Sequence, residues 1–279
     1  MLRSIYLITF LSLCISVMQA QDKLWEVNLK NKLYQVGWIE QTNDGLVLAA
    51  GAKGLAALDN NTGEIVWYNE TLKSVDKNSF LNIPQLPMFY IEYNSLLGKK
   101  RGLLINSSNG EVLFDTKEEE YRLKNFTPIP EHAMILFELT KNKTRFVMKF
   151  SLKTWQEEWI VSVGKVKKQS LLEKSLGSIS FIDHAPQFDN KGNMIIGMEN
   201  DIYVFDANNG KQLWHYEAKN KIKALVYTQV NNNLYLGVKK SNKLKIFDPA
   251  TGEDITPDKL KLRGYMIDLV KDDSGNLIL

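Results

Sequence analysis

The amino-acid sequence predicts an all-β fold, and within that class a β-propeller of four-stranded blades with about five complete blades and a partial sixth. A hairpin pattern recurs along the chain, with turn positions at residues 63, 110, 155, 210 and 252. The spacing between these turns, about 42 to 55 residues, suits one four-stranded blade per repeat. Helical periodicity is nearly absent, which favours short strands throughout.

Each hairpin copy brings its own turn residues. In three copies a β-rich run ends at an aspartate whose carboxylate can accept hydrogen bonds from the amides after it, and the second copy has Asn106 there. A glycine four residues later supplies the positive φ of a tight hairpin. In all copies but the last, a tryptophan or phenylalanine stands four residues further on. The most decayed copy, residues 146–159, has Ser151 in place of the aspartate and Trp155 in place of the glycine. The structural repeat positions are Asp59, Thr62, Gly63, Trp67, Gly110, Phe114, Trp159, Asp206, Gly210, Trp214, Asp248 and Gly252.

Two more apolar runs precede each hairpin and supply the remaining strands. A sheet of this kind leaves both faces apolar, so successive sheets must stack face to face around an axis. The repeat tryptophan can then lie across the gap between neighbouring blades, where its burial contributes about 2 to 3 kcal/mol if its N–H finds a partner. We expect first strands near residues 33–41, 80–85, 122–129, 180–188 and 222–230, and second strands at residues 46–50, 88–93, 133–139, 194–197 and 234–238.

Residues 57–67, with Asp59, Thr62 and Gly63 at the turn and Trp67 at the end, resemble the tryptophan-docking motif of the pyrroloquinoline-quinone (PQQ)-like β-propeller family. That family includes the quinoprotein alcohol dehydrogenases and, in a non-enzymatic branch, the propeller lipoprotein of the outer-membrane protein assembly machinery. The resemblance covers about residues 24–279 and implies a propeller fold. WD-type repeats are the alternative, but their Gly-His and Trp-Asp pairs do not occur in this sequence.

The two ends of the repeat region suggest an incomplete propeller. Residues 25–29 resemble a lone last strand, and in closed propellers the first strand of the chain often completes the final blade. Residues 265–270 and 276–279 resemble the first two strands of a sixth unit. The sequence therefore predicts a truncated or partial product, and a finished six-bladed ring would need about 20 more residues.

Residues 1–20 have the layout of a secretory signal peptide that is cut after Ala20: Arg3 comes first, followed by a mainly apolar run over residues 5–17. The run is shorter than the ~20 apolar residues that cross a bilayer, so we expect a secreted or periplasmic protein rather than an integral membrane protein. Leu13 stands where a lipoprotein signal needs a small residue, which argues against lipid attachment at Cys14. Cys14 is the only cysteine, so the predicted mature chain, residues 21–279, has no disulfide or thiolate chemistry.

Neither charge nor motifs indicate catalysis or nucleic-acid binding. The chain has 35 basic and 32 acidic residues, a net charge of +3, so it lacks the concentrated positive field of a nucleic-acid binder. His132, His184 and His215 are far apart and lack metal-ligand spacing. The turn aspartates already have a structural role. We therefore expect no catalytic residue, no metal and no cofactor, and we assign no cofactor ligand.

Several segments are candidates for binding. Basic residues at 165–168, 219–223 and 259–263 suit an anionic lipid or an acidic partner, although alternating lysines are also typical of half-exposed edge strands. Residues 161–181 form the longest interval between units, and a long loop on a rigid scaffold often carries a binding site. Five Asn-x-Ser/Thr sequons, at Asn60, Asn69, Asn106, Asn125 and Asn142, are glycan sites in a eukaryotic secretory protein and chance occurrences in a bacterial one.

Three functions fit these observations. The first is an exported binding or scaffold module that holds another protein in the cell envelope. The second, implied by the family resemblance, is a quinoprotein dehydrogenase with PQQ and Ca²⁺, but such enzymes usually carry a vicinal cysteine disulfide and this mature chain has no cysteine. The third is an extracellular propeller that senses a carbohydrate or another small-molecule ligand.

Overall fold

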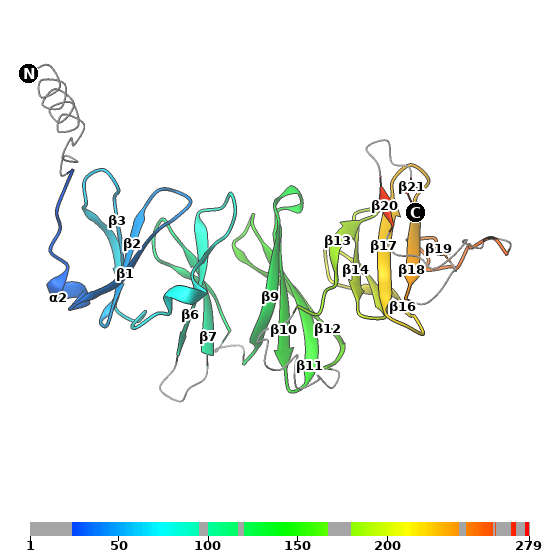
Figure 1. Ribbon diagram of the computed structural model, residues 1–279, viewed down its shortest axis with the longest axis horizontal. Helices are drawn as coiled ribbons and strands as arrows, with labels where there is room; N and C mark the ends of the chain where they lie inside the picture. Colours follow the sequence, from blue (N-terminus) through cyan, green and yellow to red (C-terminus); the bar gives the residue numbers. More distant parts are fainter. Residues whose placement is uncertain are drawn as a thin grey trace, which may run out of the picture. The chain divides into compact units, whose positions relative to one another are not determined.

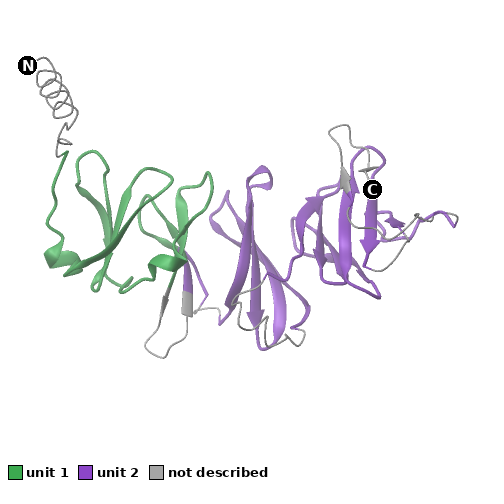
Figure 2. Ribbon diagram, in the orientation of Figure 1, with its two compact units in different colours: residues 1–100, 104–112 green, residues 101–103, 113–279 purple. Residues whose placement is uncertain are grey.

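The computed structural model describes residues 24–94, 100–116, 120–166, 180–239, 244–258, 260, 269–271 and 277–278. It confirms the predicted all-β fold of successive antiparallel sheets (Figure 1). The chain divides into two compact units, residues 1–100 with 104–112 and residues 101–103 with 113–279 (Figure 2). The predicted signal peptide, with Cys14 and Ala20, and most of the 161–181 loop lie outside the described residues.

The first sheet, in unit 1, shows why the middle strands of a blade are apolar without alternation. Strand β3 is buried at all five positions, and four of the five positions of β2 are buried. Ala49 and Ala56 pack with Leu33 from the short helix α2 (Lys30–Leu33) and with Leu58. Both faces of the sheet are therefore covered along its centre, while its first and last strands stay partly exposed. The strands run in sequence order: β1 (Val36–Gln41), β2 (Val47–Gly51), β3 (Gly54–Leu58) and β4 (Ile65–Asn69).

The second sheet repeats the same meander, and the division between the two units falls within its strands β7 and β8. Its first strand is short because residues 77–79 form a 3-10 helix directly before it. The strands are β5 (Leu81–Asn82), β6 (Met88–Asn94), β7 (Lys100–Asn106) and β8 (Val112–Asp115).

Unit 2 contains two more four-stranded sheets that pack face to face, as the sequence predicts. Leu136 and Val147 of one sheet share a buried cluster with Met194, Ile196 and Phe205 of the next. The first sheet consists of β9 (Arg122–Ile129), β10 (Met134–Lys141), β11 (Thr144–Ser151) and β12 (Gln156–Lys165). The second consists of β13 (His184–Phe188), β14 (Asn193–Met198), β15 (Asp201–Asp206) and β16 (Gln212–Glu217).

The prediction of about five blades is confirmed, and the last of the five large sheets has three strands in place of four. It consists of β17 (Ile222–Thr228), β18 (Asn233–Val238) and β19 (Leu244–Phe247). A single bridge between Phe247 and Asp254 stands where the fourth strand would run. The reason is local: the amide of Ile246 donates to the hydroxyl of Thr256 at 2.8 Å instead of to a strand carbonyl, and Pro257 follows.

The structure describes residues 25–29 at the start of the repeat region and parts of the two expected strands at its end. Residues 25–29 form no strand, and none of the described strands pairs with them. Two short strands, β20 (Val270–Lys271) and β21 (Leu277–Ile278), pair where two strands of a sixth unit were expected. Within the described part of the chain, the structure contains no helix with the length and apolarity of a membrane span.

Candidate functional site

The repeat aspartates and glycines build one recurrent turn. In the first copy the Gly63 amide donates to the carbonyl of Asp59 at 2.9 Å, and Gly63 has φ +73°. The Asp59 carboxylate accepts from the amides of Asn61 and Thr62, both at 2.8 Å. These backbone hydrogen bonds, that of Thr62 foremost, lower the pKa of Asp59. The same glycine-to-carbonyl bond and positive φ recur at Gly110, Gly210 and Gly252.

Each of these turns is covered by a tryptophan that comes from the preceding repeat. A Cβ at Gly110 would lie 2.7 Å from the indole of Trp67, and the Trp67 Nε1 donates to the carbonyl of Ser107 at 2.6 Å. Such a turn therefore needs glycine for two reasons, the left-handed backbone and the contact with the indole. The corresponding hydrogen bonds join Trp159 to Ala207 at 3.0 Å and Trp214 to Pro249 at 2.7 Å.

Trp25 makes the same contact with the first turn. Its ring would lie 2.6 Å from a Cβ on Gly63, and its Nε1 donates to the carbonyl of Asn60 at 2.8 Å. Sequence reasoning gave residues 25–29 the role of a lone strand, whereas the structure shows a docking tryptophan without a strand. The acceptor is the carbonyl three residues before the glycine, as in the other copies.

The turn at residues 151–155 departs from this pattern. Trp155 occupies the glycine position with φ +59°, and its amide still donates to the carbonyl of Ser151 at 2.9 Å. Phe114 stands at the tryptophan position of the preceding repeat and lies 5.2 Å from Phe137, between ring centroids. Since phenylalanine has no N–H, an indole hydrogen bond cannot form from this position.

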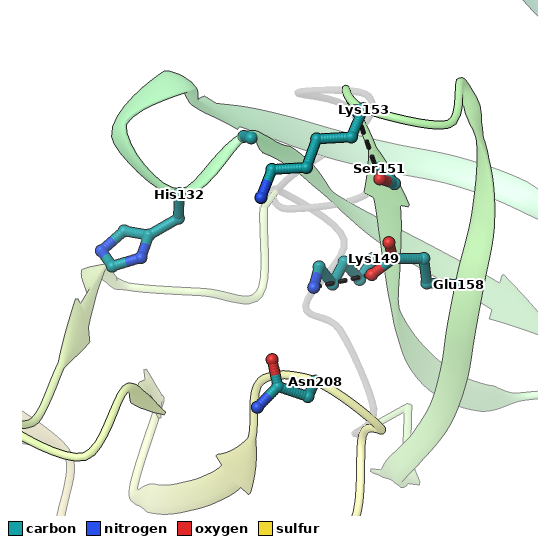
Figure 3. Close-up of a pocket in the computed structure, with 7 residues that line it drawn as sticks. His132, Lys149, Ser151, Lys153, Glu158 and Asn208 are labelled. Carbon is teal, nitrogen blue, oxygen red and sulfur yellow. Dashed lines mark hydrogen bonds and ion pairs between the residues drawn. The ribbon is translucent and has the colours of Figure 1, made fainter.

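A polar cavity of about 400 Å³ lies in unit 2 (Figure 3). Its residues come from the β9–β10 connection, from strands β11 and β12 with their turn, and from the β15–β16 turn. Sequence reasoning did not bring these segments together. The lining residues are His132, Ala133, Lys149, Ser151, Lys153, Glu158 and Asn208.

Lys149 connects this cavity to the docking contact. Its Nζ lies 2.7 Å from Glu158 Oε2 and donates to the carbonyl of Ala207 at 3.0 Å, the same oxygen that accepts the Trp159 indole. The hydrogen bond from Lys149, helped by the charges of Lys149 and Lys153, lowers the pKa of Glu158. Lys149 and Glu158 therefore neutralise each other at the wall of the cavity.

The other polar side chains of the cavity are those of Ser151, Lys153, His132 and Asn208 (Figure 3). The Lys153 ammonium forms no ion pair with the described residues, and its side chain extends toward the space between His132 and Lys149. The ring of His132 stacks on Phe188 with centroids 3.5 Å apart and an interplanar angle of 20°. This stacking fixes the imidazole from one side.

The other two histidines serve different roles. His215 lies 2.9 Å from the Asp201 carboxylate and stacks on Tyr203, so it sits on the face of its sheet. His184 begins β13. In the described part of the chain, no three His, Cys, Asp or Glu residues are grouped to hold a metal.

Glu138 is a buried acid that sequence reasoning missed. Its side chain is 0% exposed in the middle of β10, and its carboxylate accepts from the amides of Phe181 and Ile182 at 2.6 and 3.1 Å. Asn125 and Ser180 supply two more donors at 2.9 and 2.7 Å. A buried carboxylate with this many donors is a structural anchor for the segment that leads into β13.

The chain matches no family model and no curated protein. It is similar to the solved structure of BamB from Moraxella catarrhalis, with 12% identity over 82% of this chain and 64% of that one and a TM-score of 0.37. It is also similar to the Dos1 propeller, with 12% identity over 87% and 64% of the two chains and a TM-score of 0.46. For Sqt1 from Saccharomyces cerevisiae the identity is 10% over 83% and 75%, with a TM-score of 0.39. The chain thus spans 64% of the length of the first two proteins.

Proposed function

We propose that this chain is an exported β-propeller of PQQ-like repeats that binds a protein partner in the cell envelope as a scaffold module. The observation that supports it most directly is a set of exposed apolar side chains just after the repeat turns. Val66 in β4 and Leu213 in β16 both stand three residues after a turn glycine, and they are 47% and 40% exposed. The other exposed apolar residues two or three positions after a turn glycine are Ile65, Val112 and Ile255.

The position of these side chains suits protein binding. Strands β4 and β16 are the last strands of their sheets, so one side of each backbone has no ladder partner within its sheet. An extended segment of another protein can add to such an edge through backbone hydrogen bonds, while exposed apolar side chains supply contact area. In β4 two adjacent apolar side chains, Ile65 and Val66, are both exposed, and neighbouring exposed apolar residues favour an interaction surface.

The repeat residues support a scaffold more than a catalyst. The carboxylate of Asp59 is engaged by two amides of its own turn, and that of Asp206 by the amide of Asn208 and the side chain of Asn209. Their chemistry is therefore accounted for by the fold. Location in the envelope remains part of the proposal and is supported by the signal-like layout of residues 1–20.

The test compares two neighbouring substitutions in β16 during a crosslinking pull-down from the envelope fraction. Leu213→Asp places a charge on the exposed apolar position, and Gln212→Asp places the same charge on the adjacent exposed polar position. We expect the wild-type chain and Gln212→Asp to retain one partner in near-stoichiometric amount, and Leu213→Asp to recover at least about tenfold less, as for a hot-spot residue. Equal recovery with both variants, or no partner with the wild-type chain, would overturn the proposal. Thermal unfolding of both variants confirms that they are folded.

A further inference from the structure

We propose that the cavity lined by His132, Lys153 and Asn208 is a carboxylate-binding pocket that takes an aspartate or glutamate side chain of the protein partner. This inference rests on the proposed function, because it specifies the chemistry of the partner.

The cavity has a surplus positive charge. Lys149 and Glu158 form an ion pair at 2.7 Å, and the Lys149 ammonium also donates to a backbone carbonyl. Lys153 lies on the same cavity and has no carboxylate partner among the described residues. The charge of Lys153 acts on Glu158, but that carboxylate already has its ammonium in Lys149. One lysine charge is therefore left for a ligand.

Two neutral polar groups accompany that charge. His132 presents an imidazole and Asn208 presents a side-chain amide, and each comes from a different segment of the chain than Lys153 (Figure 3). A neutral imidazole donates one N–H, and a side-chain amide donates two. In Figure 3 the amide oxygen of Asn208 points toward Lys153 and Lys149, so its N–H₂ group faces a ligand only after a half-turn about the Cβ–Cγ bond. The ammonium and the imidazole offer two donor directions, which suits the two oxygens of a single carboxylate.

The backbone and the ring that carry these donors are held in place before any ligand binds. The amide of Lys153 donates to Ser151 Oγ at 3.3 Å within the turn, and the amide of Asn208 donates to Asp206 Oδ1 at 2.9 Å. His132 is fixed by stacking on Phe188. Pre-organised donors bind more tightly, because less side-chain and loop freedom is lost on binding.

The balance of charge favours a carboxylate over a phosphate group. A phosphate monoester carries close to two negative charges at neutral pH, and one of the two lysines here is already neutralised by Glu158. A carboxylate carries one charge and has a planar pair of acceptors. The cavity, about 400 Å³, also has room for the side chain that bears it and for bridging water.

The experiment titrates the full chain with N-acetyl-glutamate α-amide, which presents one side-chain carboxylate, and records the ring signals of His132 by NMR. We expect those signals to shift in a saturable manner. N-acetyl-glutamine α-amide, which has the same shape without the charge, is expected to leave them unchanged. His132→Gln assigns the signals among the three histidines. Equal shifts with both compounds, or no shift with either, would refute the carboxylate pocket, as would tighter saturation by inorganic phosphate.

Two lysine variants test the residue that carries the charge. Lys153→Gln is expected to weaken binding of the glutamate compound at least about fivefold. The matched control is Lys211→Gln, which removes an exposed lysine of the same unit that does not line the cavity, and it is expected to bind as the wild type does. Both substitutions lie in exposed turns, and thermal unfolding checks that they leave the fold intact. Unchanged binding by Lys153→Gln would exclude this pocket.

The pull-down separates this inference from the proposed function. If the wild-type chain captures a partner, and Leu213→Asp loses it while Lys153→Gln and the glutamate compound have no effect, the scaffold function stands and the pocket fails. If the glutamate compound binds through Lys153 but no partner is captured, the pocket is a carboxylate site and the scaffold function fails.

Discussion

The indole of Trp159 lies so close to Gly210 that a Cβ on this glycine would fall 2.8 Å from the ring. The glycine also has φ +71°, a conformation that other residues adopt at a cost. The same indole donates to the carbonyl of Ala207 at 3.0 Å. One turn thus combines a backbone requirement, a steric requirement and a hydrogen bond, and these can be separated by substitution.

Gly210→Ala is expected to destabilise the protein by about 1 to 3 kcal/mol more than Gly192→Ala, because overpacking adds to the backbone strain. Gly192 is the matched control: its φ is +79°, and nothing lies within 4 Å of the Cβ that alanine would add. Urea unfolding followed by tryptophan fluorescence gives both values. Equal losses of stability in the two variants would show that the indole of Trp159 moves aside without a cost in free energy.

Trp159→Phe and Lys149→Met are expected to be coupled, because both wild-type side chains donate to the same carbonyl of Ala207. After either single substitution the other donor remains, whereas the double variant leaves the oxygen without either. We expect a coupling free energy of about 0.5 to 2 kcal/mol in a double-mutant cycle. The unfolding free energies of the four proteins measure it. Additive effects within about 0.3 kcal/mol would mean that the two bonds are independent.

Glu138→Gln is expected to destabilise the protein by about 2 to 3 kcal/mol, because the new amide N–H₂ faces donors in a buried site. Ser180→Ala removes only one of the donors to Glu138 and is expected to cost about 1 kcal/mol. Urea unfolding measures both losses, and hydrogen exchange at the amides of Phe181 and Ile182 should accelerate in the Glu138 variant. Unchanged exchange at these two amides would contradict the anchoring role.

Glu158→Gln is expected to reduce stability at pH 7 by about 1 kcal/mol, because the glutamine keeps the shape but not the charge that pairs with Lys149. The folded-state pKa of Glu158 is lowered below its ordinary 4.5, so its ionised form stabilises the fold above pH 4.5. That contribution is lost as the pH falls through the folded-state pKa. The difference between wild type and variant, measured by urea unfolding from pH 7 to 3, should therefore shrink below pH 4.5. A constant difference would contradict the pairing.

The strands and their turns could be predicted from the sequence because both depend on neighbouring residues. The first strand expected at residues 122–129 forms as β9 with the same bounds, since an apolar run and the residues that end it are local signals. The sequence predicts a regular fourth strand in the last sheet, and its reduction to a single bridge could not be predicted. That reduction depends on the hydroxyl of Thr256, which accepts a hydrogen bond from the amide of Ile246 across the hairpin.

The roles of the residues around the cavity, and of the buried Glu138, could not be predicted from neighbouring residues in the sequence. A lysine in an alternating strand is typically exposed. Only the hydrogen bond from Lys149 to the carbonyl of Ala207, in the β15–β16 turn, reveals its role. Glu138 interrupts an apolar run, and the donors in residues 180–182 that justify its burial lie more than 40 residues away in sequence. Trp25 was assigned to a strand for the same reason, since its acceptor carbonyl at Asn60 is remote.

The tryptophan contacts also have a consequence for the history of the gene. The first and fourth repeats each carry a donor indole for the turn that follows and an acceptor turn for the indole before it. An unequal crossover that joins the codons up to Trp67 to those that follow Trp214 would place Trp67 over the turn at Gly252. Repeats can therefore be gained or lost without leaving a turn uncovered. One pair departs from this pattern at both positions: Phe114 replaces the tryptophan, and Trp155 replaces the glycine of the turn that follows. Such joint change follows from the contact itself, since a turn that no indole covers has lost one of its two reasons to keep glycine.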